Sequence, residues 1–378
     1  MKKILAVMLL AGCVQGAVAQ NNAEEKTLFE EVTGIKSKTD KFNLYLNMNG
    51  SFDAVDVPGE GKSGKFNMRQ LRIEAKGNVN DWLSYRWRQR LNRPNNGGDN
   101  IDNLPTSIDI AGIGVKLNDK WSIFAGKQCA AYGGIEFDLN PIEIYEYSDM
   151  IENMSNFMSG LNIGYDFAAG QQLNFQVLNS LNGSFESTYG DVDVEPTKVP
   201  LVYTLNWNGN FNDVFKTRWS ASIMNQGKDE KMTYFALGNE LSLGKFGMFL
   251  DYMYSKEDID RKRIITGMLG GGASLPGAEY MSVVTKLNYR FTPNWNVFVK
   301  GMYETASLDK KVGEFADGKY RTSLGYFAGL EYYPIENSNL HFFLTYVGRK
   351  FDYTSKVALK DYDTNRVSVG FIYQMKMF

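Results

Sequence analysis

Apolar and polar residues alternate along most of the chain after residue 41. In the first such stretch every second position is apolar, at Phe42, Leu44, Leu46 and Met48, and the positions between them carry asparagine or tyrosine. The same spacing recurs in residues 199–207, 246–254 and 367–373. Successive side chains of a β-strand point to opposite faces, so each stretch predicts a strand with one apolar and one polar face.

Strands of this kind can be placed along the whole chain from residue 42 to the C-terminus. The predicted strands are residues 42–53, 65–78, 82–92, 106–118, 121–128, 157–168, 171–181, 199–209, 214–225, 232–243, 246–256, 279–291, 295–306, 319–333, 340–351 and 362–377. The connectors switch strictly between short and long, as in an antiparallel barrel whose ends face different compartments. We therefore predict an all-β fold over residues 41–378, a transmembrane antiparallel β-barrel of about 16 strands with short periplasmic turns and long extracellular loops.

Residues 1–19 resemble a secretory signal peptide. Lys2 and Lys3 precede an apolar run, and Ala17 and Ala19 form a small-residue cleavage site before Gln20. A second interpretation stays open, because residues 10–13 resemble a lipoprotein signal box in which Cys13 would be lipidated. Either signal exports the chain.

Residues 20–40 are predicted to form a periplasmic N-terminal segment. Leu28, Val32 and Ile35 have helical spacing among glutamate and lysine residues. A short helix and a disordered tail both fit this pattern.

Two further features favour a membrane barrel over a soluble β-protein. Beyond the signal no stretch approaches the roughly 18 apolar residues of a spanning helix, so residence in a membrane requires a closed sheet. Aromatic residues recur beside the short turns, at Trp82, Trp121, Phe215 and Trp295, as in the aromatic girdle of a barrel. We therefore expect the outer membrane of a Gram-negative bacterium, with membrane lipid and lipopolysaccharide around the protein.

A barrel of this size leaves an aqueous channel, so the architecture predicts a porin for passive diffusion of small hydrophilic solutes and ions. The formal net charge is only −2, which gives no indication of a nucleic-acid partner. One histidine, His341, and one cysteine after the signal, Cys129, cannot make a zinc site, and we expect no metal and no cofactor. Two alternatives stay open: an outer-membrane barrel enzyme, and a secreted soluble β-protein that binds carbohydrate.

The third predicted strand carries arginine at every second position. Because a guanidinium facing hydrocarbon costs about 2 to 4 kcal/mol near the midplane, Arg86, Arg88 and Arg90 are predicted to form a ladder inside the lumen. The same rule predicts further pore-lining basic residues at Arg72, Lys76, Lys116, Lys216, Arg218, Lys286, Arg290 and Lys300. Carboxylates offset them in part, at Glu74, Asp109, Asp166, Glu240, Asp251, Glu304 and Glu331.

The longest connector, near residues 129–156, is predicted to be a constriction loop with helical character within 142–156. Long structured loops are usually functional. The acidic residues of this connector are Glu136, Asp138, Glu143, Glu146, Asp149 and Glu152, and no lysine or arginine follows Lys127 before its end. Three interpretations stay open: a solvated external loop, an acidic lining of the pore eyelet, and a divalent-cation bridge to lipopolysaccharide.

Two stretches resemble the phosphate-selective porin O and P family. They are residues 66–77 with 82–86, and residues 115–128 with 134–136. The resemblance implies a homotrimeric outer-membrane channel in which an arginine ladder guides anions towards a lysine-lined constriction. Arg86, Arg88 and Arg90 match the ladder, whereas the constriction loop here is acidic. The resemblance therefore implies at most a mild, phosphate-like anion preference.

Overall fold

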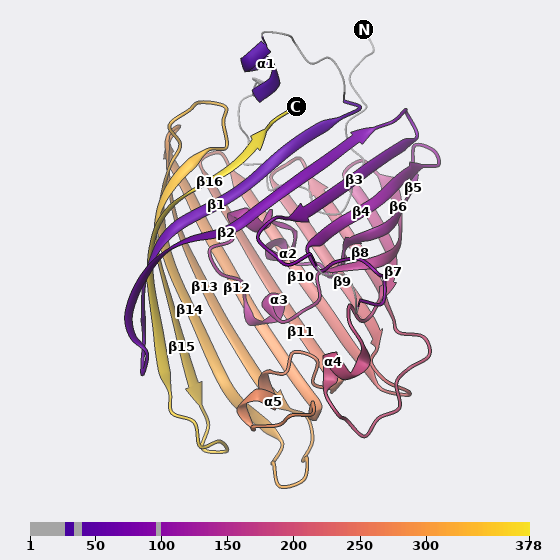
Figure 1. Cartoon of the computed structure of the whole chain (residues 1–378), viewed down its shortest axis with the longest axis vertical. Helices are drawn as coiled ribbons and strands as arrows, with labels where there is room; N and C mark the ends of the chain where they lie inside the picture. The colour runs from indigo at the N-terminus through magenta and orange to yellow at the C-terminus, as the bar shows by residue number, and fades with distance from the viewer. Residues whose placement is uncertain (1–26, 34–39, 96–99) are drawn as a thin grey trace.

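The computed structural model describes residues 27–33, 40–95 and 100–378. Within these residues sixteen strands close into one antiparallel barrel, in which each strand pairs with its sequence neighbours and β1 pairs with β16 (Figure 1). The strands are β1 Asn43–Val57, β2 Gly61–Asn78, β3 Leu83–Arg90, β4 Ile108–Lys116, β5 Trp121–Cys129, β6 Phe157–Ala168, β7 Gln171–Asn179, β8 Leu201–Phe211, β9 Phe215–Asn225, β10 Lys231–Leu243, β11 Phe246–Ile259, β12 Pro276–Thr292, β13 Trp295–Leu308, β14 Gly318–Tyr332, β15 His341–Tyr353 and β16 Tyr362–Lys376. The predicted fold class is confirmed.

The helical segments are short and lie outside the strands. They are α1 Leu28–Thr33, α2 Ile135–Asp138, η1 Pro141–Glu143, α3 Asp149–Glu152, α4 Phe185–Tyr189 and α5 Ile264–Met268. No helix among residues 27–33, 40–95 and 100–378 is long and apolar enough to cross a membrane.

The prediction that connectors strictly alternate in length is wrong at three places. The link from β14 to β15 at the short-turn end, residues 333–340, is as long as the link from β15 to β16, residues 354–361. The link from β1 to β2 is only residues 58–60, and the link from β9 to β10 is only residues 226–230. Both β1 and β2 extend four residues beyond their predicted ends because their pairing continues to Val57 and Gly61. Gly59 and Gly61 have φ values of 87° and 77°, which the tight turn requires and which glycine adopts without steric cost.

The strands expose their apolar face and bury their polar face. Leu205 is 56% exposed and its neighbour Asn206 only 1%, and Val369 is 56% exposed beside Ser368 at 2%. This arrangement is stable only where the surroundings are apolar and the polar faces meet inside the barrel. It excludes the soluble secreted β-protein and fits the outer membrane.

Aromatic rings gather at the end of the barrel that carries the short turns. Trp82 is 54% exposed, and Trp121 stacks on Tyr165 with ring centroids 4.4 Å apart. The backbone N–H groups of residues 377 and 378 both donate to the carbonyl oxygen of Leu44, so the strand register breaks there. This break brings the Phe378 ring to 5.6 Å from Phe42 on the outer face.

Helix α1 begins with a reciprocal cap. Thr27 Oγ1 accepts from the backbone N–H of Glu30 at 3.0 Å, and Glu30 Oε2 accepts from the N–H of Thr27 at 2.9 Å. Of the two interpretations of this segment, a short helix and a disordered tail, the helix is observed over residues 28–33. The proposed signal peptide, residues 1–19 with Cys13, and the helical position Ile35 lie outside the described residues.

In the connector between β11 and β12, Asp260 is followed by three basic residues, of which the first two are largely enclosed. The N–H groups of Arg261 and Lys262 donate to the Glu257 carboxylate, and the N–H of Arg263 donates to Asp260 at 2.8 Å. Arg261 is 8% exposed and Lys262 is 4% exposed. This backbone is therefore fixed and shielded.

Trypsin added to intact cells is expected to cut after the exposed Lys198 and Lys311 and to spare residues 261–263. Proteases need a mobile, accessible backbone, which the enclosed segment does not offer. Mass spectrometry of the released peptides checks this result, and protein unfolded in detergent should be cut at all these sites. Cleavage at the turn residues Lys120 or Lys245 with Lys198 intact would show that the long loops do not face outside.

Candidate pore constriction

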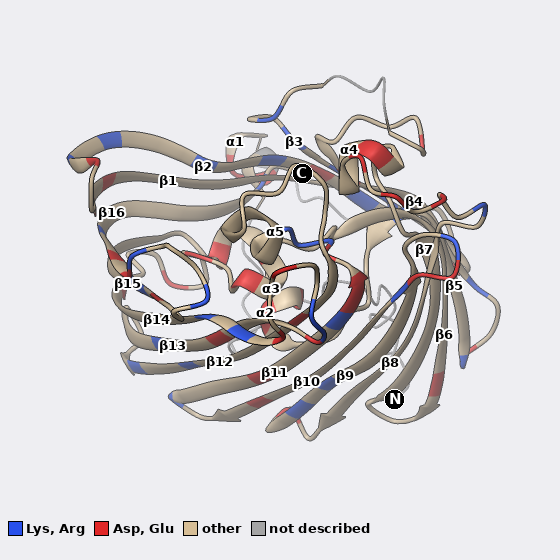
Figure 2. Ribbon diagram, turned by 90° about the horizontal axis from the view of Figure 1, so that it is seen from below, with Lys and Arg blue, Asp and Glu red and all other residues tan. Residues whose placement is uncertain are grey.

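The connector between β5 and β6 folds into the barrel. Figure 2, which looks along the barrel from its long-loop end, shows α2 and α3 within the ring of strands. Tyr132 and Ile142 are fully buried and Met150 is 1% exposed, because they pack against inward side chains of the wall. The interpretation as a solvated external loop is wrong, and helical structure begins at Ile135, earlier than predicted.

Three carboxylates of the wall hold the loop. Asp251 of β11 accepts from the backbone N–H groups of Ile135 and Glu136 at 2.7 and 2.8 Å. Glu304 of β13 accepts from the N–H of Asp149 at 2.7 Å, and Glu331 of β14 accepts from the Tyr145 hydroxyl at 2.8 Å. These buried hydrogen bonds to charged acceptors fix the loop position.

The acidic residues of the loop are mostly paired with basic residues of the wall. The pairs are Glu136 with Lys300, Asp138 with Arg218 (3.0 Å), Glu146 with Arg366 (2.9 Å) and Arg349 (3.4 Å), and Asp149 with Arg349 (2.9 Å) and Arg321. The interpretation as an acidic lining of the eyelet is corrected, because four of the six carboxylates pair with basic groups of the barrel wall. Among the described residues no group of three or more His, Cys, Asp or Glu is placed to hold a metal ion, so the divalent bridge has no support there.

The other two acidic residues differ from these four. Glu152 is exposed. Glu143 lies near Glu331, His341 and Lys286, and burial raises its pKa above the usual value of a glutamate. His341 is 1% exposed, its Nδ1 lies 2.9 Å from the carbonyl oxygen of Asn339, and its ring stacks on Tyr333.

Replacing Lys300 by methionine is expected to lower the free energy of unfolding by about 3 to 5 kcal/mol, because Glu136 is then buried without its cationic partner. Denaturant unfolding in detergent, followed by tryptophan fluorescence, measures the change. The double variant Lys300→Met, Glu136→Gln should recover most of the loss. Equal losses in the single and double variants would show that the ion pair is not what matters at this position.

The predicted arginine ladder lies inside the barrel on β3. Arg86 pairs with Glu74 of β2 at 2.8 Å. Arg88 and Arg90 both pair with Asp109 of β4, at 3.3 and 2.7 Å, and Arg72 of β2 reaches the same carboxylate at 3.1 Å. Lys76 lies on the same side, 4.9 Å from the ring centre of Tyr45.

We call this set of seven side chains the arginine wall. It consists of Arg72, Glu74, Lys76, Arg86, Arg88, Arg90 and Asp109. Five cations thus face two carboxylates on three adjacent strands, which leaves a local excess of positive charge. On the loop side of the lumen, by contrast, acidic and basic groups largely cancel.

The remaining predicted pore-lining residues are spread over the lumen. Lys116 pairs with Asp119 in a short turn and Lys216 with Glu240. Lys286 lies 4.4 Å from the Phe298 ring centre, and Arg290 donates to the carbonyl oxygen of Pro293 near the short-turn end. They do not form one cluster, and Arg218 and Lys300 bind the constriction loop.

Sequence reasoning missed three basic residues that form ion pairs with the loop: Arg321, Arg349 and Arg366. Arg366 follows the polar face of its strand, so the alternation could have found it. Arg349 could not be assigned in this way, because inward positions of β15 include the apolar Phe343 and Val347.

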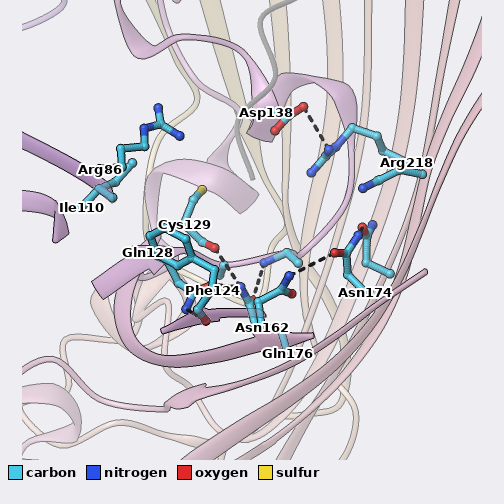
Figure 3. Close-up of a pocket in the computed structure, with 14 residues that line it drawn as sticks. Arg86, Ile110, Phe124, Gln128, Cys129, Asp138, Asn162, Asn174, Gln176 and Arg218 are labelled. Carbon is cyan, nitrogen blue, oxygen red and sulfur yellow. Dashed lines mark hydrogen bonds and ion pairs between the residues drawn. The ribbon is translucent and has the colours of Figure 1, made fainter. Parts of the chain in front are cut away.

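A narrow recess remains between the constriction loop and the wall formed by β3–β9 (Figure 3). Arg86 and Arg218 lie on opposite sides of it, and Asn162, Asn174 and Gln176 lie between them. The amides are ordered by mutual hydrogen bonds: Asn162 donates to Asn174 at 3.0 Å, and Gln176 donates to Gln128 at 3.0 Å. The recess is polar, and its charged groups are two arginines and Asp138.

Comparison with known proteins identifies a family and several solved structures that this chain resembles. The chain matches the model of a family described as phosphate-selective porin O and P over residues 42–375. It is similar to the outer membrane channel DcaP of Acinetobacter baumannii, with a TM-score of 0.61 and 15% identity over 90% of this chain and 99% of that one. It is also similar to OmpF of Salmonella typhi, solved with daunomycin, with a TM-score of 0.58 and 15% identity over 90% and 99% of the two chains.

A third similar structure is the trimer form of OmpT from Vibrio cholerae, with a TM-score of 0.54 and 12% identity over 89% of this chain and 100% of that one. No curated protein matches the chain significantly. At these identities the likeness to solved structures supports the fold alone.

Proposed function

Since the chain belongs to the phosphate-selective porin O and P family and is an outer-membrane porin, we propose that small hydrophilic solutes and ions diffuse through it along the arginine wall, with a mild preference for anions. The observation that carries this proposal is the excess of positive charge on β2–β4. Charges this close act as one field, because they lie within the screening length of about 8 Å at physiological salt. Guanidinium groups also match the planar oxygens of carboxylate and phosphate.

The preference is proposed to be mild for two reasons. Each arginine of the wall shares a carboxylate, Glu74 or Asp109, which lowers the net field. The loop side contributes little, because its carboxylates and the facing arginines neutralise one another. We infer no catalytic role for His341, since its Nδ1 faces a backbone carbonyl oxygen, its ring stacks on Tyr333, and the Tyr333 hydroxyl donates to Glu331.

A planar-bilayer recording of the detergent-extracted protein in a potassium chloride gradient tests the proposal. The reversal potential should indicate that chloride passes more readily than potassium by a modest factor. Strong cation preference would refute the anion path along the arginine wall. The absence of any conductance would refute diffusion through the barrel itself.

We further propose that the protein is a homotrimer. The strands β3, β4 and β5 are short, with 8, 9 and 9 residues against 18 in β2, so the barrel is low on this side. Pairing of β2 with β3 starts at Arg72, so among the described residues no strand covers residues 61–67 on that side, and Phe66 there is 86% exposed. An open sheet edge beside apolar side chains favours pairing with another chain, and a second copy would cover it.

Native mass spectrometry in detergent tests the oligomer. The wild-type protein should be a trimer, and Phe66→Arg should release monomers. Leu205→Arg, on the outer face of β8, is the matched control, and the detergent-extracted variant should still be a trimer. A wild-type monomer, or an unchanged trimer in Phe66→Arg, contradicts this interface.

A further inference from the structure

The connector between β11 and β12, residues 260–275, lies over the constriction loop at the long-loop end. Figure 1 shows α5 nearer to that end than α3, and Figure 2 shows α5 within the ring of strands when viewed from the same end. Its apolar residues pack inwards: Ile265 is fully buried, and Leu269 and Leu275 pack on the central apolar cluster. This connector therefore covers part of the lumen entrance.

Arg261 links the connector to two other loops. Its Nη1 donates to the hydroxyl of Tyr189 at 3.2 Å, and its Nη2 donates to Ser155 Oγ at 2.9 Å. Ser155 belongs to the constriction loop, and Tyr189 belongs to α4 in the connector between β7 and β8. One guanidinium thus joins three connectors at the long-loop end.

Further buried groups lock the connector in place. Lys262 and Glu257 form an ion pair in which both side chains are fully buried. Asp260 accepts from the hydroxyls of Tyr280 and Thr266 at 2.6 and 2.7 Å. Such a fully satisfied polar network is rigid, and its loss leaves buried groups unpaired.

We propose that residues 260–275 form a second constriction in series with the loop of residues 130–156, and that Arg261 is the positioning residue that holds it over the recess. This inference rests on the proposed path along the arginine wall and adds a size limit at the entrance. Small ions pass the outer constriction, whereas bulkier solutes are stopped before they reach Arg86 and Arg218. The two constrictions then select by different means, the outer one by size and the inner one by size and charge.

Cys129 supplies a reporter for this inference, because it lines the recess (Figure 3). The experiment compares two membrane-impermeant thiol reagents added to intact cells: the small methanethiosulfonate ethylsulfonate and the bulky fluorescein-5-maleimide. The test variant replaces residues 261–274 by a short Gly/Asn turn, which the backbone hydrogen bond from Asp260 to Leu275 permits. A second variant, Arg261→Gln, removes only the anchoring guanidinium, and Arg261→Lys keeps the charge.

We expect the bulky reagent to modify Cys129 at least tenfold faster in the shortened variant than in the wild type, and the small reagent to react at similar rates in both. Arg261→Gln should show an intermediate rate, with Arg261→Lys closer to the wild type. The route from the short-turn end is the same in every protein, so the difference isolates the connector. Shortening residues 354–361, between β15 and β16, is the matched control and should change neither rate.

Equal rates of the bulky reagent in wild type and shortened variant would overturn the inference. So would rapid modification of the wild type by both reagents. Neither result would touch the proposed anion path, which is judged by conductance and reversal potential of the wild-type channel. Cys129→Ser must abolish all labelling for the rates to report on the recess.

Discussion

Replacing Arg86, Arg88 and Arg90 together by glutamine is expected to shift the ion selectivity of the channel towards cations. The change removes three positive charges from the arginine wall and leaves Arg72 and Lys76 to balance Glu74 and Asp109. The wall then becomes neutral. Reversal potentials in a salt gradient measure the shift.

The shift should be largest at low salt. The screening length is about 30 Å at 0.01 M salt and about 3 Å at 1 M, so the field of the wall reaches across the path only in dilute solution. Each single substitution should have a smaller effect than the triple one, because neighbouring charges contribute to one potential. Comparison at both salt concentrations separates a field effect from a change in pore shape.

The triple variant should still fold. Asp109 keeps Arg72 as an ion-pair partner at 3.1 Å, so it is not left buried without a cation. Heat-modifiable migration of the detergent-extracted protein checks the fold. Lys62, Lys198 and Lys360, replaced together by glutamine, form a control that removes the same charge from the exposed long-loop end. If the triple variant folds and its selectivity equals that of the wild type at every salt concentration, these arginines do not line the path.

Removing the constriction loop is expected to increase the conductance and to strengthen the anion preference. Cys129 pairs directly with Phe157, so residues 130–156 can be replaced by a short Gly/Asn turn without moving the strands. The loop fills the middle of the lumen, and its loss widens the path. The conductance then rises until the connector of residues 260–275 limits it.

The change in selectivity follows from the ion pairs of the loop. Removing the loop removes its four paired carboxylates, Glu136, Asp138, Glu146 and Asp149. On the loop side of the lumen, five basic residues then face three carboxylates. The basic residues are Arg218, Lys300, Arg321, Arg349 and Arg366, and the carboxylates are Asp251, Glu304 and Glu331. The emptied side of the lumen thus acquires positive charge that the loop had neutralised. Single-channel conductance and reversal potential measure both effects.

Shortening the exposed connector of residues 354–361 is the matched control for loop removal. It should change neither conductance nor selectivity, because the connector lies at the rim between β15 and β16. An unchanged conductance after removal of residues 130–156 would mean that this loop does not restrict the path. An increase in cation preference would mean that the loop carboxylates do not neutralise the facing basic residues.

The sequence by itself determined the strands, their facing and the inward direction of the arginine ladder. These are local properties: side chains alternate along each strand, and the cost of a charge in lipid decides which face turns inward. Every predicted strand overlaps an observed one, and Arg86 and Arg88 are buried inside the barrel as expected. The length of the connector after β5 was also readable, and this connector packs inside the barrel.

Only the tertiary structure decided what the charges of the loop do. Asp149 and Arg349 are 200 residues apart in the chain, and they meet only because the loop crosses the lumen to the wall formed by β13–β16. The lengths of β1 and β2 likewise depended on continued pairing between the two strands, which local propensity does not specify. The enclosure of residues 260–275 also depends on distant segments, because Tyr189, Ser155 and Tyr280 bond the polar groups of Asp260 and Arg261. Pairings between distant segments depend on the shape of the closed sheet, and no spacing within one segment encodes them.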